Sequence, residues 1–447
     1  MSKPRQIIVV GAGLAGLSAA YRLQEAGCAV TVLEKLDRPG GRVLTLRRDG
    51  FVIDAGPDAM TNGYREYRSL ATAVGLGDRF GPSSPVVGLI RDGRVIDIDT
   101  ARVAMLPFTS ALSAPAKLKL ISGVMKIRAQ LKGVDSFRLT ESAHHDDDHE
   151  TAEQFSERLF GREVTRYLMD PLVRLVVGSG AAHASRLSVL GALVNWSVPL
   201  INIRGGLDAL PRALASRLSL TYGADVQRVA ETSIGVEVAY RDSDGTAHTL
   251  AADACVIATT FDVARAIHAS LAARTDDYAR HLSFLPLVSV SLAYAAPTRS
   301  RAYVVQVPTV EDPETLLIFL QHNKAPDRAP AGHSLITLYT DGMATPRFLP
   351  QTDAAIVAWA RPRIERLFPE IAARFQFASV SRWPIAWYLA TPGFWRRTQG
   401  LLAGLQPQSR VQIAGDLFGA GSMESAVHWG RRAADRIVAS EKEAVGG

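Results

Sequence analysis

Residues 6–34, QIIVVGAGLAGLSAAYRLQEAGCAVTVLE, predict a β-strand, an α-helix and a second β-strand. The first strand is the apolar, β-branched run Gln6–Val10, which is typical of a strand buried on both faces, and Ala29–Leu33 has the same character. Between the strands, apolar residues recur at helical spacing, and Gly27 is placed to end the helix. A strand, a helix and a strand in this order favour an α/β fold.

Three glycines with the spacing G-x-G-x-x-G, Gly11, Gly13 and Gly16, follow the first strand and open the helix. Gly11 permits a tight turn, Gly13 lets the backbone approach a pyrophosphate, and Gly16 lets the helix pack closely on the sheet. Glu34 follows the second strand, eighteen residues after Gly16, and is placed to accept hydrogen bonds from ribose hydroxyls. The pattern predicts a dinucleotide site at the helix N-terminus, where free N–H groups favour anions. A strand–helix turn without a ligand is the alternative.

A second glycine pair, Gly40-Gly41, comes soon after Glu34 and is followed by Arg42. The glycines allow the chain to pass close to a second part of a large ligand, and Arg42 is suited to bidentate contact with a phosphate or a flavin. A polar turn without a ligand is the alternative here.

The composition excludes several classes of protein. The 447 residues include 50 Lys and Arg against 44 Asp and Glu, a net charge of +6, and 47% are hydrophobic, which is ordinary for a globular protein. Disorder, a collagen helix and a coiled coil are therefore excluded for the chain as a whole. Two cysteines, Cys28 and Cys255, cannot form a disulfide framework, so they favour a reducing compartment.

The sequence also indicates where the protein works and what it meets. Its apolar runs are too short to cross a membrane, and its N-terminus has no signal-peptide pattern. No dense basic run points to nucleic acid. We therefore expect a cytoplasmic protein that binds a small-molecule substrate, with no nucleic-acid partner and no integral membrane segment. A homodimer is compatible with the sequence.

Further motifs extend the pattern along the chain: Asp54-x-Gly56, Ala414-Gly415-Asp416, GSMESAV at 421–427, and Gly430. Together with the two glycine motifs and Glu34, this set resembles the flavin-containing amine oxidoreductase superfamily, and the resemblance covers nearly the whole chain in the right order. The middle of the chain is more similar to the protoporphyrinogen oxidase branch, through Asp170-Pro171-Leu172-Val173, Leu187-Ser188 and GGLDALP at 205–211.

The resemblance implies that the chain binds FAD, without a covalent link because no cysteine lies near the C-terminal motif. It implies that Asp416 holds a ribityl hydroxyl, that the Met423 amide faces the flavin, and that the Val226 backbone faces the adenine. The cofactor-binding residues that we predict are Gly11, Gly13, Leu14, Ala15, Gly16, Glu34, Lys35, Gly40, Gly41, Arg42, Gly56, Pro57, Val226, Gly415, Asp416, Ser422 and Met423.

The implied fold is α/β with two interleaved domains. A Rossmann-type FAD-binding domain comprises residues 1–75, 205–262 and 405–440. A substrate domain of mixed or antiparallel sheet comprises residues 76–204 and 263–404, and includes a helical subdomain at about residues 100–200. The active site is expected between the two domains.

Two features depart from the amine oxidases of the superfamily. Residues 285–292, LPLVSVSL, contain no lysine where many amine oxidases carry one beside the flavin. Ser422 stands where they often have an aromatic residue. Both departures favour the protoporphyrinogen oxidase-like branch, whose substrates are often large and apolar.

Three side chains are candidates for a catalytic role: His428, Trp387 and Tyr388. Residues 383–395 hold three of the six tryptophans, and predict either an aromatic wall over the flavin or ordinary core packing. His428 follows the C-terminal flavin motif and is suited either to proton transfer or to packing between helices.

We expect no metal site. The run SAHHDDDHE at 142–150 holds residue types that bind metals, but it lies between expected elements and lacks a fixed helical spacing. It favours a disordered surface segment.

The leading hypothesis is an FAD-dependent oxidoreductase. It would remove hydride from a C–H bond next to nitrogen or within a ring, and pass the electrons to oxygen or another acceptor. A redox-neutral isomerase or desaturase-like flavoenzyme is the second hypothesis. A non-enzymatic lipid or prenyl carrier on the same fold is the third.

Overall fold

The computed structural model describes residues 4–101, 109–196, 198–405 and 409–445. Its first layer is a five-stranded sheet in which every pair of neighbours is parallel. In order across the sheet the strands are β10 (Ser219–Thr221), β2 (Ala29–Leu33), β1 (Gln6–Val10), β14 (Ala254–Ile257) and β20 (Val411–Ile413). The chain therefore leaves this sheet and returns to it three times, at β10, β14 and β20.

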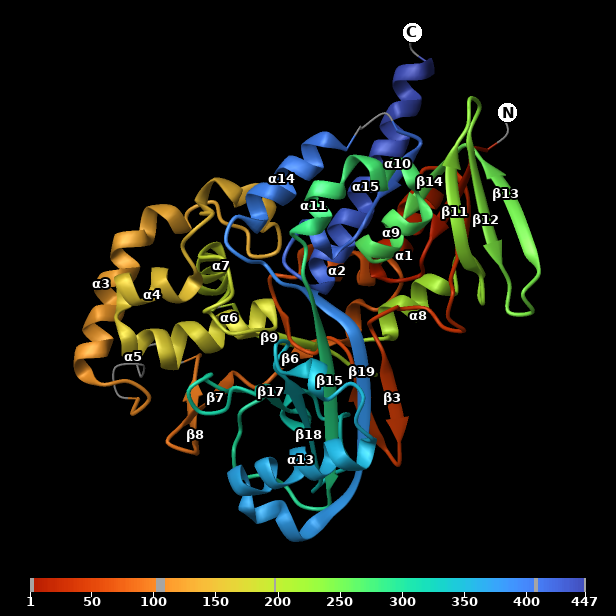
Figure 1. Ribbon diagram of the computed structural model, residues 1–447. Coiled ribbons are helices and arrows are strands. Elements are labelled where there is room, and N and C mark those ends of the chain that lie inside the picture. Colours follow the sequence, from red (N-terminus) through yellow and green to blue (C-terminus); the bar gives the residue numbers. More distant parts are fainter. Residues whose placement is uncertain (1–3, 102–108, 197, 406–408, 446–447) are drawn as a thin grey trace.

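Two helices pack together beside the parallel sheet (Figure 1). Helix α1 (Leu14–Glu25) follows β1, and α15 (Met423–Val445) follows β20. The Ser18 hydroxyl of α1 donates to the Val427 carbonyl of α15 at 3.2 Å. The N-terminal and C-terminal parts of the chain thus form one layer.

The second layer is a seven-stranded sheet that is antiparallel except between β16 and β7. In order its strands are β19 (Phe375–Tyr388), β15 (Phe284–Tyr294), β18 (Ser334–Thr340), β17 (Thr315–Leu320), β16 (Val304–Gln306), β7 (Val86–Arg91) and β8 (Arg94–Asp99). Helix α13 (Asp353–Leu367) packs on β19 and β15. The expected α/β fold with a mixed or antiparallel second sheet is confirmed.

A helical lobe stands at the left of Figure 1. It contains α3 (Ala114–Leu131), α4 (Ala152–Phe160), α5 (Arg162–Val164), α6 (Asp170–Val177) and α7 (Leu187–Asn195). The Ser113 side chain caps α3, and Thr151 with Gln154 forms a capping box at α4, because the first N–H groups of a helix need acceptors.

Smaller elements complete the fold. Three short sheets are formed by β3 (Thr45–Arg48) with β4 (Phe51–Asp54), by β5 (Met60–Thr61), β9 (Leu200–Ile203) and β6 (Phe80–Pro82), and by β11 (Asp225–Glu231), β12 (Val236–Arg241) and β13 (Ala247–Ala252). The other α-helices are α2 (Arg65–Ala73), α8 (Ala209–Ala215), α9 (Phe261–Ile267), α10 (Ala269–Arg274), α11 (Asp276–Arg280), α12 (Gln321–Lys324) and α14 (Phe394–Gly404). Within the described part of the chain, no helix has both the length and the apolar character needed to cross a bilayer.

The expected disorder of residues 142–150 is wrong. This run ends the 3₁₀ turn Leu139–His145 and continues to the cap of α4. Asp146 is buried and accepts hydrogen bonds from the Ser185 hydroxyl and, at 2.9 Å, from the Trp395 amide. Its partners are distant in sequence, so a local pattern did not reveal them.

Candidate functional site

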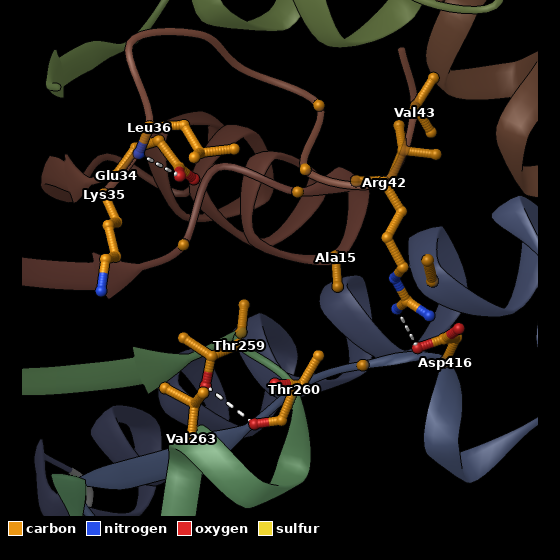
Figure 2. Close-up of a pocket in the computed structure, with 18 of the residues that line it drawn as sticks. Ala15, Glu34, Lys35, Leu36, Arg42, Val43, Thr259, Thr260, Val263 and Asp416 are labelled. Carbon is orange, nitrogen blue, oxygen red and sulfur yellow. Dashed lines mark hydrogen bonds and ion pairs between the residues drawn. The ribbon is translucent and has the colours of Figure 1, made fainter. Parts of the chain in front are cut away.

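A cavity of about 470 Å³ lies where the parallel strands end. Val10 and Leu33, the last residues of β1 and β2, line it, as do Ala258 after β14 and Gly415 after β20. Because parallel strands present their carboxyl ends on the same edge of a sheet, segments far apart in sequence meet here. Figure 2 shows Glu34 and Lys35 at one end of the cavity and Arg42 with Asp416 at the other.

The first glycine turn forms one wall. Gly11 has a φ of +99°, which favours glycine, and its amide donates to the Leu33 carbonyl at 2.8 Å. Gly13 is the N-cap of α1, and no side chain of the described residues caps this helix end. A Cβ built on Gly13 meets no described atom within 4 Å. The turn thus presents free N–H groups and open space, as an anionic ligand requires.

Glu34 joins this turn to the end of β2. Its buried carboxylate accepts from the Ala12 amide at 2.6 Å and from the Leu36 amide at 2.9 Å (Figure 2). Each carboxylate oxygen keeps a further lone pair, so the same group is free to accept from a ligand hydroxyl.

Arg42 and Asp416 form an ion pair at the other end of the cavity. The Arg42 Nη2 lies 2.6 Å from the Asp416 Oδ1, and its Nη1 donates to the Ala386 carbonyl at 3.0 Å (Figure 2). Burial lowers the pKa of Arg42, but the Asp416 carboxylate outweighs it and raises that pKa above its ordinary value. Arg42 is thus a fixed cation beside the cavity.

A second helix N-terminus faces the same space. Helix α15 begins at Met423, which lines the cavity together with Ser422. The Ser422 hydroxyl accepts from the Ser425 amide at 3.1 Å and so caps part of this end. The dipoles of α1 and α15 therefore favour negative charge in the cavity next to each helix N-terminus.

The aromatic segment divides between the cavity and the core. Trp383 and Trp387 of β19 line the cavity, and the Trp383 indole donates to the Ala55 carbonyl at 2.8 Å. A Cβ on Gly178 would lie 2.7 Å from the Trp387 ring and one on Gly421 2.9 Å, so backbone packs against this indole. Trp395 is buried in the core. Two of the three tryptophans thus line the cavity and the third packs in the core, while a place beside a flavin stays a prediction.

The other two catalytic candidates lie in the packed interior. The Tyr388 hydroxyl accepts from the Phe261 amide at 3.3 Å, and burial raises the pKa of this phenol. The His428 Nδ1 lies 2.6 Å from the Glu66 carboxylate and the ring packs on Trp429. His428 therefore packs beside Trp429, contacts Glu66 and is not among the described residues that line the cavity.

The structure brings together sixteen of the seventeen predicted cofactor residues as lining of this one cavity. The exception is Gly16, where a Cβ would lie 1.9 Å from the Gly11 carbonyl oxygen. This position serves the close packing of α1 under the turn, as the motif requires. Among the described residues, no group of three or more His, Cys, Asp or Glu could hold a metal ion.

Sequence reasoning missed several lining residues. They are Leu36, Arg38, Thr259, Thr260, Val263, Leu287 and Ala386. Thr259 and Thr260 (Figure 2) follow the buried strand β14 after one intervening residue, Ala258. The logic that identified Glu34 after β2 could have identified them.

A buried charge cluster beneath the cavity was also missed. Gly56 and Pro57 line the cavity, and Asp54 and Asp58 flank them. The Lys324 ammonium lies 2.8 Å from a carboxylate oxygen of each aspartate, and all three side chains are fully buried. Burial raises the pKa of Asp54, but Lys324 and Arg328 outweigh it and hold that pKa low, at about 2.

The profile described as flavin containing amine oxidoreductase matches residues 14–438. The chain belongs to this family. A flavin is the family's cofactor, and the residues that line the cavity fit a dinucleotide with an aromatic end. The α1 N-terminus suits its phosphates, Glu34 suits a ribose, and the α15 N-terminus and the tryptophans suit its aromatic ring.

Curated relatives match only part of this chain. Protoporphyrinogen oxidase 2 of Arabidopsis thaliana is 30% identical over 197 residues, which are 43% of this chain and 36% of that protein. The chain therefore spans about a third of the length of this curated relative.

Solved structures share the fold along the whole chain. Cyclohexylamine oxidase from Brevibacterium oxydans IH-35A is 18% identical, with a TM-score of 0.75 over 98% of this chain and 100% of its own. The CLA-producing fatty acid isomerase from P. acnes is 15% identical, with a TM-score of 0.72 over 97% of this chain and 98% of its own. At these identities the likeness shows a common fold.

Proposed function

We propose that this protein is an FAD-dependent oxidoreductase. It removes hydride from a C–H bond, next to a nitrogen or within a conjugable ring, of a small and largely apolar substrate, and passes the electrons to oxygen or another acceptor. The observation that carries the proposal is the single cavity that unites the α1 and α15 N-termini, Glu34, the Arg42–Asp416 pair and the β19 tryptophans.

The roles of the residues follow from their places. The free N–H groups at Gly13 to Ala15 would hold the pyrophosphate, Glu34 the adenosine ribose, and the Val226 backbone the adenine. Asp416, oriented by Arg42, would hold a ribityl hydroxyl. Bound FAD supplies the hydride acceptor, while the protein supplies orientation and the positive potential of the α15 N-terminus.

Several features support an apolar substrate. Leu287, Ala386 and the two tryptophans form the cavity wall nearest the second sheet. Strand β15 carries no lysine at 285–292, and Ser422 replaces an aromatic residue before the Met-Glu pair. These features agree better with a protoporphyrinogen oxidase-like enzyme than with an amine oxidase.

Cofactor linkage, compartment and assembly belong to the proposal as well. FAD is held without a covalent bond, because neither Cys28 nor Cys255 is among the described residues that line the cavity. We place the protein in the cytoplasm, compatible with a homodimer and without a nucleic-acid partner. The FAD domain comprises residues 1–75, 205–262 and 405–440, and each of these ranges contributes a strand to the parallel sheet.

A redox-neutral flavin isomerase is the second candidate. The apolar wall favours a substrate of the lipid or polyene type, and the fatty acid isomerase from P. acnes has this fold. A carrier that uses the fold without FAD is opposed by the glycine turn and Arg42–Asp416 pair, which would then have no ligand to hold.

The test is the flavin itself. Purified protein should be yellow, with an absorbance band near about 450 nm that belongs to the flavin. Amines, amino acids, and tetrapyrrole and polyene precursors are then added without oxygen. Lasting bleaching supports net oxidation, and turnover without bleaching supports isomerisation. Colourless protein that takes up no FAD would contradict both.

A further inference from the structure

Residues 55–57 lie between the cavity and the second sheet, and we call them the 55–57 segment. Strands of the second sheet supply hydrogen-bond donors to its carbonyl groups. The Ala55 carbonyl accepts from the Ser289 hydroxyl of β15 and from the Trp383 indole of β19, both at 2.8 Å. The Tyr339 hydroxyl of β18 donates to the next carbonyl along the segment. Two successive carbonyls are therefore directed at the second sheet.

The Gly56 amide in this segment has no acceptor among the described residues. Gly56 is nevertheless buried, and it lines the cavity. The peptide bond that joins Ala55 to Gly56 is trans, so its N–H points opposite to the Ala55 carbonyl and away from the two side chains that hold this carbonyl. Buried N–H groups almost always have an acceptor. The geometry therefore calls for an acceptor that belongs to a ligand in the cavity.

The buried charge cluster fixes both flanks of the 55–57 segment. The Lys324 ammonium lies 2.8 Å from a carboxylate oxygen of Asp54 and of Asp58. The Asp54 carboxylate also accepts from the Leu207 amide at 2.9 Å, and the Asp58 carboxylate accepts from the Tyr303 hydroxyl at 2.6 Å. Because a buried network of paired groups is rigid, the segment is not free to turn its N–H toward another acceptor.

The free N–H lies at the Arg42 end of the cavity. A Cβ at Gly56 would lie 2.0 Å from the Arg42 carbonyl oxygen and 3.6 Å from the Trp383 ring. Glycine is thus required at this position. The Arg42 end is opposite Glu34 (Figure 2), and it is the end at which the proposed function places the flavin ring. The amide is therefore placed to meet the ring rather than the adenosine.

We propose that the Gly56 amide donates a hydrogen bond to the polar edge of the flavin ring, and that Ser289 and Tyr339 are the positioning residues that direct it there. This inference rests on the proposed function, because it needs a flavin at this end of the cavity. Reduced flavin carries more negative charge on its ring oxygens and nitrogens than oxidised flavin, so a fixed donor stabilises the reduced form. The second sheet thereby raises the reduction potential of the flavin.

The experiment follows flavin reduction in FAD-loaded protein against a reference dye of known potential. Ser289→Ala removes one of the two donors to the Ala55 carbonyl, so the peptide group gains freedom and the Gly56 hydrogen bond weakens. The equilibrium should shift toward oxidised flavin by roughly threefold to tenfold, as expected when one hydrogen bond is largely lost. The visible absorption band of the bound flavin should move as well. A merely structural role would lower the unfolding temperature and leave both flavin properties unchanged.

Ser291→Ala is the matched control. Ser291 lies two residues further along β15 and is as buried as Ser289, each 2% exposed, but its hydroxyl pairs with that of Thr337 at 2.9 Å. This variant should keep the dye equilibrium of the unaltered protein. Tyr339→Phe should shift the equilibrium in the same direction as Ser289→Ala, and it decides the matter if Ser289→Ala fails to fold by circular dichroism.

Two results overturn this inference and leave the proposed function standing. One is a folded Ser289→Ala protein that titrates against the dye as the unaltered protein does. The other is a Ser291→Ala protein whose equilibrium shifts as far as that of Ser289→Ala. Unaltered protein that takes up no flavin would instead contradict the proposed function, and with it this inference.

Discussion

Gly13 and Gly16 belong to one motif but stand in opposite surroundings. A Cβ at Gly13 points into the cavity, whereas one at Gly16 would lie 1.9 Å from the Gly11 carbonyl oxygen. Gly13→Ala should therefore fold normally and retain less FAD, as measured by flavin absorbance per protein after gel filtration. Gly16→Ala should lower the unfolding temperature itself. A Gly13→Ala protein with full FAD content would contradict this placement of the pyrophosphate.

Lys324 neutralises two carboxylates in the interior. Lys324→Met leaves Asp54 and Asp58 without this partner, which should lower the free energy of unfolding by about 3–5 kcal/mol at pH 7. The exposed pair Lys35–Asp225 gives the control, because Lys35→Met should change it by less than about 1 kcal/mol. Urea unfolding measures both.

The same variant has a distinct pH dependence. In the unaltered protein the low pKa of Asp54 stabilises the fold above pH about 4, and this contribution is lost as the pH falls toward about 2. Without Lys324 the pKa of Asp54 rises, so the carboxylate takes up a proton in milder acid and avoids a buried charge. The loss in the free energy of unfolding caused by Lys324→Met should therefore be smaller at about pH 5 than at pH 7. An equal loss of stability at both pH values would argue against an ionic role for Lys324.

The pair of helices α1 and α15 depends on Gly430. A Cβ there would lie 2.2 Å from both the Ala15 carbonyl oxygen and the Ser18 hydroxyl. Gly430→Ala should separate the helices and lower the free energy of unfolding by about 1–3 kcal/mol. It should also weaken FAD retention, because both helices present their N-termini to the cavity.

Gly400 in α14 is the matched control for Gly430. It is exposed, and its added Cβ would touch none of the described atoms within 4 Å. Gly400→Ala should stabilise the protein by about 0.5–1 kcal/mol, because alanine favours a helix interior. If denaturant unfolding showed that both substitutions destabilise the protein equally, close packing of α1 against α15 would not explain the effect at Gly430.

The sequence predicts those elements whose residues form a recognisable local pattern, such as an apolar run. Buried parallel strands are apolar runs, so β1, β2 and β14 are predictable, and the residues just after them reach the cavity. Lys324 gives no such signal, because its partner Asp54 is 270 residues away in sequence. The place of Asp146 likewise depends on distant Ser185 and Trp395. Tertiary pairing of this kind has no local pattern.

At the level of the whole molecule, the cavity joins segments from both ends and the middle of the chain. Gly13, Val226 and Asp416 come from the three parts that build the parallel sheet, and Trp387 comes from the second sheet. A ligand that spans them stabilises the folded state by about 2.7 kcal/mol at a hundredfold excess over its Kd. FAD should therefore raise the unfolding temperature of flavin-depleted protein.

A comparison of FMN with FAD tests whether the ligand extends along the whole cavity. It has the flavin end but lacks the adenosine that Glu34 and Val226 would contact, so it should raise the unfolding temperature much less than FAD. Differential scanning fluorimetry with each compound measures this, and Gly13→Ala should reduce the FAD shift. An FMN shift as large as that of FAD would mean that the Glu34 end of the cavity does not hold adenosine. The cofactor would then occupy only the half of the cavity beside Arg42 and Asp416.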